Sequence, residues 1–163
     1  MSYCKSFQPS VNEYSEILIL GSMPGGKSLE MQQYYAYPRN RFWQVMSVIC
    51  NFPDLTKVTY NEKLQILLDN KIALWDVIST CNREGSTDSK IKNPVLNDIN
   101  GLVFEYINIK KICLNGGTAY NLFSKSFKNT KNIKICPLPS TSPMNTTVTT
   151  EELIKIWSDN IKF

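Results

Sequence analysis

Polar side chains that could do chemistry follow each of four short apolar segments in the sequence. The segments span residues 17–20, 72–77, 109–114 and 133–138, and each runs into a loop-forming stretch. The polar residues at these ends are Ser22, Asp76, Asn115 and the run Ser140, Thr141 and Ser142. If the segments are parallel strands, their carboxyl ends meet at one edge of a sheet. We therefore expect these side chains to converge on one cleft.

The chain contains no histidine, so its chemistry has to proceed without imidazole. Histidine-based acid–base catalysis, Ser–His nucleophiles and most zinc enzymes are thereby excluded. The five cysteines are widely spaced and form no C-x-x-C pair, which is typical of buried free thiols. We expect no metal site and no cofactor.

A possible phosphate-binding loop is the string Gly21-Ser-Met-Pro-Gly-Gly-Lys-Ser28, which has the spacing G-x-x-x-x-G-K-[ST]. In such a loop main-chain N–H groups hold phosphates, Lys27 reaches the terminal ones, and Asp76 resembles a magnesium ligand. The pattern predicts a nucleotide kinase or NTPase. The motif also requires a long helix directly after Lys27, and Tyr34–Pro38 interrupts that segment after about two turns.

The elements that position these residues alternate along the chain. Segments with helical spacing lie between and after the apolar runs, at residues 41–50, 60–68, 94–106, 118–127 and 150–161, while residues 79–89 form a loop-like stretch. Strands that alternate with helices form a parallel sheet covered on both faces. We predict an α/β fold, a three-layer α/β/α sandwich with a four-stranded parallel sheet, in a single domain spanning residues 1–163.

The composition and charge fit such a domain. Hydrophobic residues make up 42% of the 163 residues, which is enough for a core. No apolar run approaches the ~20 residues of a membrane span, and the start lacks an apolar leader, so we expect a cytoplasmic protein. The net charge of +4 falls within residues 81–163, with six lysines and no acid between Lys110 and Cys136. This asymmetry suits a phosphate-bearing partner, although a solvated lysine-rich face is equally consistent.

Six blocks of sequence carry a resemblance that covers almost the whole chain. They are Gly-Ser-x-Pro-Gly-x-x-Ser-Leu at 21–29, Gln-Tyr-Tyr-Ala-Tyr-Pro-Arg-Asn-Arg-Phe-Trp at 33–43, Leu-Trp-Asp-Val-Ile at 74–78, Cys-x-Arg-Glu-Gly-Ser-x-Asp-Ser at 81–89, Asn-Gly at 115–116, and Leu-Pro-Ser-Thr-Ser-Pro at 138–143. In this order they resemble the uracil-DNA glycosylase superfamily, specifically its hypoxanthine-DNA (deoxyinosine) glycosylase branch. The ordered set is far more specific than any one block.

The resemblance implies an enzyme that flips a damaged nucleotide out of the DNA stack and binds its base. Tyr35 would lie against the flipped base, and main-chain groups of Ser22 and Tyr35 would bond the base edge. Asp76 stands where uracil-specific relatives carry an Asn, and it could accept from N1–H of hypoxanthine, a donor that adenine lacks. Asn115 could face the same pocket. The alternatives are core packing for Tyr35, a turn cap for Asp76 and a plain turn at Asn115.

The resemblance assigns the catalytic step to Asn40. In most of the superfamily a polar residue in the first loop positions water, but here Met23 occupies that place. In the hypoxanthine branch the Asn of Pro-x-Asn-x-Phe-Trp takes this role, and in this chain that residue is Asn40. Leu138 replaces the residue that opens the second motif in related branches, which argues against efficient uracil excision. Capping the helix that follows is an alternative role for Asn40, and both roles can hold at once.

Small and polar loop residues would hold the DNA strand. Serine and threonine hydroxyls and main-chain N–H groups can bond phosphates, and an apolar side chain can fill the vacated stack. A surface turn is the alternative for the loop at 83–86. The residues expected to contact DNA are Gly25, Ser28, Arg83, Ser86, Ser140, Thr141, Ser142 and Met144.

These expectations combine into one predicted function. The chain would be a monofunctional DNA glycosylase that hydrolyses the N-glycosidic bond of deaminated bases, chiefly hypoxanthine, for base excision repair. No lysine stands in a recognisable nucleophile position, so no Schiff base or strand cleavage is expected. The partner would be DNA containing deaminated bases. We expect the protein to act as a monomer and not to associate with a membrane. A P-loop nucleotide kinase or NTPase and a non-catalytic DNA-damage binder remain alternatives.

Overall fold

Four parallel strands form the main sheet in the computed structural model, which describes residues 2–161. They are β2 (Ile17–Gly21), β3 (Ile72–Asp76), β6 (Lys111–Asn115) and β7 (Lys134–Leu138), in the spatial order β3-β2-β6-β7. The two central strands, β2 and β6, are buried at every position, which explains their nearly continuous apolar sequences. The predicted four-stranded parallel sheet is confirmed.

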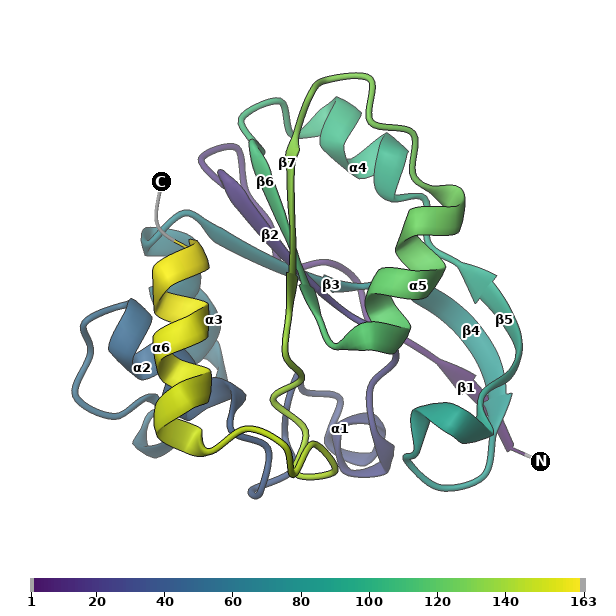
Figure 1. Cartoon of the computed structure of the whole chain (residues 1–163), viewed down its shortest axis with the longest axis horizontal. Coiled ribbons are helices and arrows are strands. Elements are labelled where there is room, and N and C mark those ends of the chain that lie inside the picture. Colours follow the sequence, from purple (N-terminus) through teal and green to yellow (C-terminus); the bar gives the residue numbers. More distant parts are fainter. Residues whose placement is uncertain (1, 162–163) are drawn as a thin grey trace.

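Helices cover both faces of this sheet (Figure 1). On one face lie α2 (Phe42–Ile49), α3 (Tyr60–Asp69) and α6 (Thr150–Ile161), and on the other lie α4 (Ile99–Glu105) and α5 (Gly117–Ser126). The short α1 (Gly26–Met31) and the 3-10 turns η1 (Leu55–Lys57) and η2 (Asp88–Lys90) lie in connecting segments. The three predicted layers are therefore present. No helix within residues 2–161 has the length and apolar character to cross a membrane.

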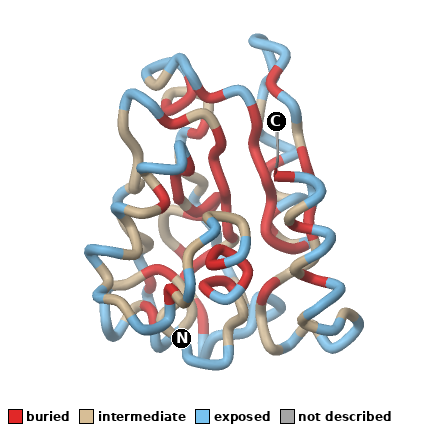
Figure 2. Tube along the Cα trace, turned by 90° about the vertical axis from the view of Figure 1, so that its left-hand side faces the viewer, coloured by how far each residue is buried: buried red, intermediate tan, exposed pale blue. Residues whose placement is uncertain are grey.

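Alternating side chains of the strands divide the core into two clusters. In β2, Ile17 and Ile19 pack toward α2, α3 and α6, whereas Leu18 and Leu20 pack toward α4 and α5. Trp157 of α6 is fully buried in the first cluster. Buried residues accordingly follow the strands and the inward sides of the helices (Figure 2). This packing on both faces fixes where each strand ends.

A second, antiparallel sheet lies beside the main one. It contains β1 (Ser2–Lys5), β4 (Ile78–Arg83) and β5 (Lys92–Leu96), in the order β1-β4-β5. We expect a loop over residues 79–89 from the sequence, but β4 extends to Arg83. We also expect a helix over residues 94–106, but β5 extends to Leu96 and α4 begins at Ile99. Pro94 is tolerated because β5 is an exposed edge strand. The helix starts only after Asp98, whose carboxylate accepts from the Gly101 N–H at 2.9 Å.

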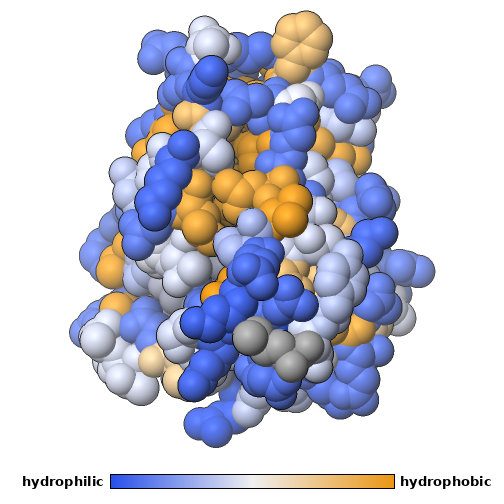
Figure 3. All heavy atoms as spheres, turned by 90° about the vertical axis from the view of Figure 1, so that its right-hand side faces the viewer, coloured by the Kyte–Doolittle hydropathy of each residue, from blue (hydrophilic) through white to orange (hydrophobic). Residues whose placement is uncertain are grey.

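The small sheet supports the loop that follows β2. Cys4, Ile78 and Cys81 of the sheet form a third buried cluster together with Met23 of that loop. On this side of the molecule a group of apolar side chains reaches the surface among hydrophilic ones (Figure 3). The loop after β2 is thus supported by the antiparallel sheet of β1, β4 and β5, which the sequence analysis does not predict.

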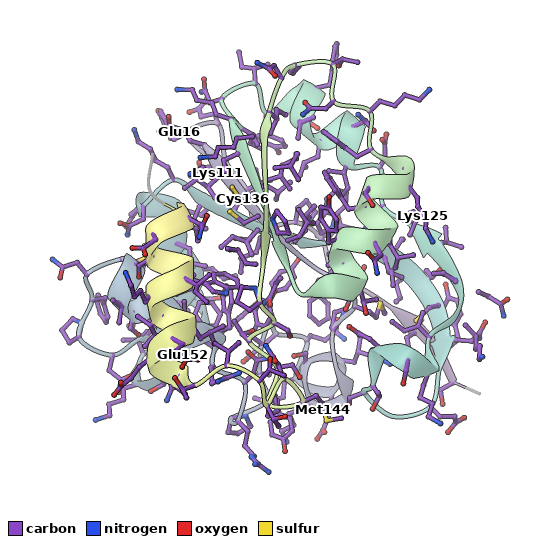
Figure 4. All side chains as sticks on the ribbon, viewed as in Figure 1. Glu16, Lys111, Lys125, Cys136, Met144 and Glu152 are labelled. Atoms are coloured by element: carbon purple, nitrogen blue, oxygen red, sulfur yellow. The ribbon has the colours of Figure 1, made fainter. Side chains whose placement is uncertain are left out.

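The two ends of the main sheet differ in character. At the end where the strands begin, Glu16 binds the ammonium groups of Lys71 and Lys110 at 2.8 and 3.1 Å. Lys111 is buried at the same end. Figure 4 shows Glu16 and Lys111 far from Met144, which lies in the loop beyond β7 at the opposite end. The polar loops predicted to hold the site therefore gather at the end away from Glu16.

Candidate active site

A cleft of about 650 Å³ opens at the carboxyl ends of the four parallel strands. Its walls come from residues 21–28, 86–89 and 140–145, from residues 34, 35, 37, 39 and 40, and from Asp76 and Asn115 at the ends of β3 and β6. All of the predicted site residues except Arg83 line this cleft. The size is that of a small-molecule pocket. None of the six lysines between residues 110 and 134 is among the described residues that line it.

Asp76 lies in the cleft as a buried carboxyl group. The residue is 4% exposed, and its Oδ2 atom has no hydrogen-bond partner among the described residues. Burial raises the pKa of Asp76 to about 7; the negative charge of Asp88 adds to this rise, and the positive charge of Arg83 opposes it. A buried oxygen that lacks a partner is costly, so it marks a place where a ligand can bind.

Gly21 makes room for this carboxyl group. A Cβ atom at position 21 would lie 2.7 Å from Asp76 Oδ1 and 3.0 Å from the Tyr35 hydroxyl oxygen. Any side chain at this position would therefore push Asp76 or Tyr35 from its place. The glycine that opens the first sequence block is explained by this close approach, not by phosphate binding.

Tyr35 is held firmly at the cleft wall. Its ring stacks on Phe42 with 3.8 Å between ring centroids, and its hydroxyl oxygen accepts from Asn115 Nδ2 at 3.2 Å. The backbone is left-handed here, with φ of +53°, a conformation that costs energy for a tyrosine. Burial raises the pKa of the Tyr35 hydroxyl above its usual range. The ring is thus fixed in position and uncharged near neutral pH.

Asn115 joins β6 to the loop after β7. Its Oδ1 accepts from the Thr141 N–H at 3.0 Å, and its Nδ2 donates to Thr141 Oγ1 at 3.0 Å and to the Tyr35 hydroxyl. Thr141 is fully buried, and its carbonyl accepts from the Arg41 N–H at 3.0 Å. Thr141 therefore anchors the loop inside the protein, and its side chain does not face outward as a phosphate contact.

A second set of contacts ties the loop after β4 to the loop after β2. Ser22 Oγ donates to the Asp88 carboxylate, 2.9 and 3.0 Å from its two oxygens. Ser86 Oγ accepts from the Gly26 N–H at 2.7 Å. Both serines expected at the DNA or base surface thus have protein partners. The carbonyl of Ser22 accepts from the Ile78 N–H at 3.0 Å, which uses one of its two lone pairs.

Arg83 lies beneath the cleft, and this placement corrects its expected role as a surface phosphate contact. The side chain is 1% exposed, and its Nη2 donates to the Pro24 carbonyl. Burial raises the pKa of both Asp76 and Asp88, and the positive charge of Arg83 opposes this rise. Arg83 supports the first loop and places a positive charge near two carboxyl groups.

Asn40 lines the cleft, and its side-chain amide also contacts the start of α2. Its Oδ1 accepts from the Phe42 N–H at 3.0 Å, at the start of α2. Its Nδ2 has no hydrogen bond among the described residues, and the residue lines the cleft. Asn40 is not the N-cap of α2, which is Arg41, but its side chain accepts from the N–H of the first residue of the helix. One lone pair of Oδ1 and the Nδ2 group remain available.

Ser28 and Gly25 shape the first loop. Ser28 is buried, and its Oγ accepts from the Ala36 N–H at 3.0 Å, which holds the segment that carries Tyr35. Gly25 is the N-cap of α1 and lies against Ser86. The helix that follows ends after Met31, where Gln32 is left-handed, so the long helix that a nucleotide-binding P-loop requires is missing here.

The loop after β7 presents its polar groups in tight turns. Ser140 Oγ accepts from the Ser142 N–H and Ser142 Oγ accepts from the Met144 N–H, both at 3.1 Å. Met144 lines the cleft and is 72% exposed. An exposed apolar tip on a hydrogen-bonded loop is suited to insertion into a partner.

Asp88 in the cleft and Arg41 beside it have contacts that the sequence analysis did not predict. Asp88 faces the cleft, although its block, Arg-Glu-Gly-Ser-x-Asp-Ser, was recognised in the sequence. Arg41 donates from Nη1 and Nη2 to the carbonyls of Val148 and Asn145 at 2.8 and 3.0 Å, and so closes the loop before α6. No local spacing pattern links Arg41 to residues more than 100 positions away, and only the fold reveals this contact.

Comparison with known proteins gives consistent results. The model of the uracil DNA glycosylase superfamily matches residues 9–160. A protein of Methanosarcina barkeri named hypoxanthine DNA glycosylase is 41% identical over 112 residues, which cover 69% of this chain and 70% of that protein. A protein of the same name from Methanosarcina acetivorans is 41% identical over 115 residues, which cover 71% of this chain and 72% of that protein.

The fold is similar to that of a solved structure. The solution NMR structure of a Methanosarcina acetivorans protein, described as a candidate uracil DNA glycosylase, aligns with a TM-score of 0.80. The two chains are 33% identical, and the alignment covers 97% of this chain and 98% of the other.

Proposed function

The chain belongs to the uracil DNA glycosylase superfamily, and from this membership we propose that it is a DNA glycosylase acting on deaminated bases, chiefly hypoxanthine in deoxyinosine. Two relatives that are 41% identical to this chain are named hypoxanthine DNA glycosylase. The observation that carries the proposal is the cleft itself, where the unpartnered oxygen of Asp76 lies near an immobilised tyrosine ring. Such a pocket suits one flipped base.

Base binding falls to Tyr35 and Asp76 in this proposal. One face of the Tyr35 ring lies on Phe42, which leaves the other available to stack on a base. Asp76 bonds the edge of the base through its unpartnered oxygen. Asn115 holds Tyr35 and the loop after β7, so its part is to position them. The carbonyls of Ser22 and Tyr35 each accept a hydrogen bond from the protein, the latter from Trp43 Nε1 at 3.1 Å, and each keeps a second lone pair for the base edge. The side chain of Ser22 positions Asp88.

Asn40 orients the attacking water. In hydrolysis the water oxygen bonds to C1′ of the sugar, the C1′–N9 bond breaks, and the base leaves with the electron pair and takes up a proton. The second lone pair of Asn40 Oδ1 accepts from the water, while the first stays on the Phe42 N–H. Positioning of this kind supplies much of the rate in reactions where the substrate carries most of the chemistry.

DNA contacts fall to the rim of the cleft. The serines at 140 and 142 keep hydroxyl protons that can donate to phosphate oxygens, and Met144 can fill the gap that the flipped nucleotide leaves. Gly25, Ser28 and Ser86 shape the opposite rim, where main-chain groups can approach the strand. Arg83 and Thr141 do not contact DNA in this proposal. Arg83 holds the loop after β2, and Thr141 holds the loop after β7.

The reaction needs no covalent enzyme intermediate. Lys27, the lysine that lines the cleft, pairs with Glu30 at 3.8 Å. Within residues 2–161, no group of three or more Cys, Asp or Glu side chains is placed to hold a metal ion. We therefore propose a monofunctional enzyme that leaves an abasic site and an uncut strand.

The test is an excision assay on oligonucleotides that each carry one hypoxanthine, uracil, xanthine or adenine. The reactions contain EDTA, and abasic sites are cut with alkali before electrophoresis. We expect strong release of hypoxanthine and no alkali-independent strand cleavage. Tight binding of inosine DNA without base release would instead favour a damage-binding protein. A strict requirement for ATP and magnesium would favour a nucleotide kinase.

A further inference from the structure

The protonation state of Asp76 decides what this residue can offer a bound base. An ionised carboxylate only accepts hydrogen bonds, whereas a neutral carboxylic acid donates through one oxygen and accepts through the other. Deaminated bases present a carbonyl oxygen beside a ring N–H, that is, one acceptor next to one donor. Only the neutral acid matches both groups at once.

The surroundings of Asp76 favour the neutral acid. The residue is 4% exposed, and no cation is hydrogen-bonded to its carboxyl group among the described residues. The positive charge of Arg83 in β4 acts on Asp76, but no hydrogen bond joins the two side chains, and Arg83 Nη2 donates to the Pro24 carbonyl instead. Burying an ionised carboxylate without a paired cation is costly, and the group takes up a proton instead.

The other titratable groups that face Asp76 either repel its charge or stay uncharged. Asp88, from the segment after β4, is held in the cleft by Ser22 Oγ, and its charge raises the pKa of Asp76. The hydroxyls of Tyr34, Tyr35 and Tyr60 have pKa values raised above their ordinary range by burial, so they remain neutral near pH 7.

We propose that Asp76 binds the flipped base as a neutral carboxylic acid, donating to the carbonyl oxygen of the base and accepting from the adjacent ring N–H, and that Asp88 helps to keep it neutral. This inference rests on the proposed glycosylase function. It names the recognised chemical group as the lactam edge, which hypoxanthine, xanthine and uracil share. It also assigns Asp88 as a positioning residue that acts through Asp76 and Ser22.

The proposal gives a definite direction of pH dependence. The binding form disappears as the pH rises through the pKa of Asp76, which is about 7. For a single ionisation, the single-turnover rate of hypoxanthine release should fall about tenfold between about pH 6 and about pH 8. An acceptor role for ionised Asp76 predicts the opposite, a rate that rises over the same range.

Two substitutions test the assignment. Asp76→Asn replaces the acid by an amide, which donates from nitrogen and accepts at oxygen at any pH. Its excision rate should stay within about tenfold of the wild-type rate at about pH 6 and lose the fall above pH 7. Asp88→Asn removes the repelling charge but keeps an oxygen for Ser22, so the fall should move to lower pH. Asp54→Asn, outside the cleft, should keep the wild-type profile.

The outcomes distinguish failure of the neutral-acid assignment from failure of the proposed glycosylase function. A wild-type enzyme that releases hypoxanthine with a flat or rising profile would overturn the neutral-acid assignment and leave the function intact. An Asp76→Asn variant that is folded by thermal melting but keeps the wild-type fall would do the same. Absence of release at every pH by the wild-type protein would overturn the proposed function, and this inference with it.

Discussion

In the proposed mechanism the side-chain oxygen of Asn40 has both a structural role and a catalytic role. Oδ1 accepts from the Phe42 N–H at the start of α2, and the same atom is available to water from the cleft side. The two duties are compatible because a carbonyl oxygen has two lone pairs. They also make separate predictions, because a helix start affects stability and a positioned water affects rate.

Asn40→Ala should lower the single-turnover rate of hypoxanthine release by about 10²-fold, because an unpositioned water attacks poorly. It should also lower the free energy of unfolding by about 1 kcal/mol through loss of the hydrogen bond at the start of α2. Asn40→Ser should recover the stability but not the rate. Both quantities are measured by rapid-quench assays and urea unfolding.

The matched control is Thr59→Ala, which removes the N-cap of α3 by deleting the hydroxyl that accepts from the Glu62 N–H at 3.2 Å. It should cost similar stability and leave excision unchanged. If folded Asn40→Ala protein released hypoxanthine at the wild-type rate, Asn40 would have no part in the mechanism.

Sequence blocks located the residues of the cleft but not all of their duties. Tyr35, Asp76 and Asn40 line the cleft as expected. Arg83 and Thr141 have polar side chains in surface-like loop sequences, yet both are buried. Arg83 donates to the Pro24 carbonyl, and the N–H of Thr141 donates to Asn115 Oδ1. Their burial depends on contacts with residues 26 to 59 positions away, which no local pattern contains.

Among the elements, the loop after β7 depends on Asn115 for its position. Asn115→Ala leaves the buried Thr141 N–H without its acceptor, which should cost about 1–3 kcal/mol. Hydrogen exchange should accelerate at residues 139–145, and excision should fall because Tyr35 also loses a partner. Exchange is measured by mass spectrometry on the folded protein.

Asn129→Ala is the matched control for this change. Asn129 also bonds one residue twice, donating to the Ile133 carbonyl at 2.7 Å and accepting from its N–H at 2.8 Å, but it lies outside the cleft. It should lower stability without affecting the loop or the excision rate. Unchanged exchange at 139–145 in Asn115→Ala, combined with lost activity, would mean that Asn115 contacts the base directly.

Met144 allows the loop to be tested against duplex DNA. Met144→Ala should reduce excision from a duplex about tenfold and leave single-stranded excision unchanged, because only the duplex has a stack to fill. Stability should change by less than about 0.5 kcal/mol, since the side chain is 72% exposed. Ile107→Ala, 73% exposed and outside the cleft, is the control. Equal loss on both substrates would contradict the wedge role.

Element prediction succeeded where a pattern was long and buried. The strands of the main sheet are continuous apolar runs, and their bounds differ from the prediction by two residues or fewer. β4 and β5 were missed because their sequences contain asparagine, proline and lysine, and they form only by pairing with each other and β1. Tertiary pairing decided these segments against local propensity.

At the scale of the whole molecule, charge and cleft are arranged differently from the sequence expectation. The lysine-rich stretch suggested a phosphate-binding face, but its members do not line the cleft. The basic side chains of the described residues that do line it are Lys27 and Arg39. Net charge along a sequence does not reveal which end of a sheet a segment reaches.

If Asp76 is a buried neutral acid, the free energy of unfolding should depend on pH in a definite direction. The pKa of Asp76 is about 7 in the folded protein, against an ordinary value of about 3.9 in the unfolded chain. Between these values the unfolded chain ionises and the folded protein does not, so stability falls as the pH rises. The loss reaches about 1.4 kcal/mol per pH unit, or about 4 kcal/mol across the window.

Asp76→Asn removes this contribution, so the variant should gain stability relative to wild type as the pH rises from about 4 to about 7. Urea unfolding of both proteins at several pH values measures the difference. Parallel stability curves for the two proteins would show that Asp76 ionises normally in the folded state.

The identity of the reaction products tests the central claim most directly. The protein is incubated in EDTA with a duplex that carries one deoxyinosine, and free hypoxanthine and abasic sites are both quantified by mass spectrometry. We predict equal amounts of the two products and an intact strand. A strand that is cleaved without released hypoxanthine, or a duplex that stays unchanged with excess protein, would contradict the account.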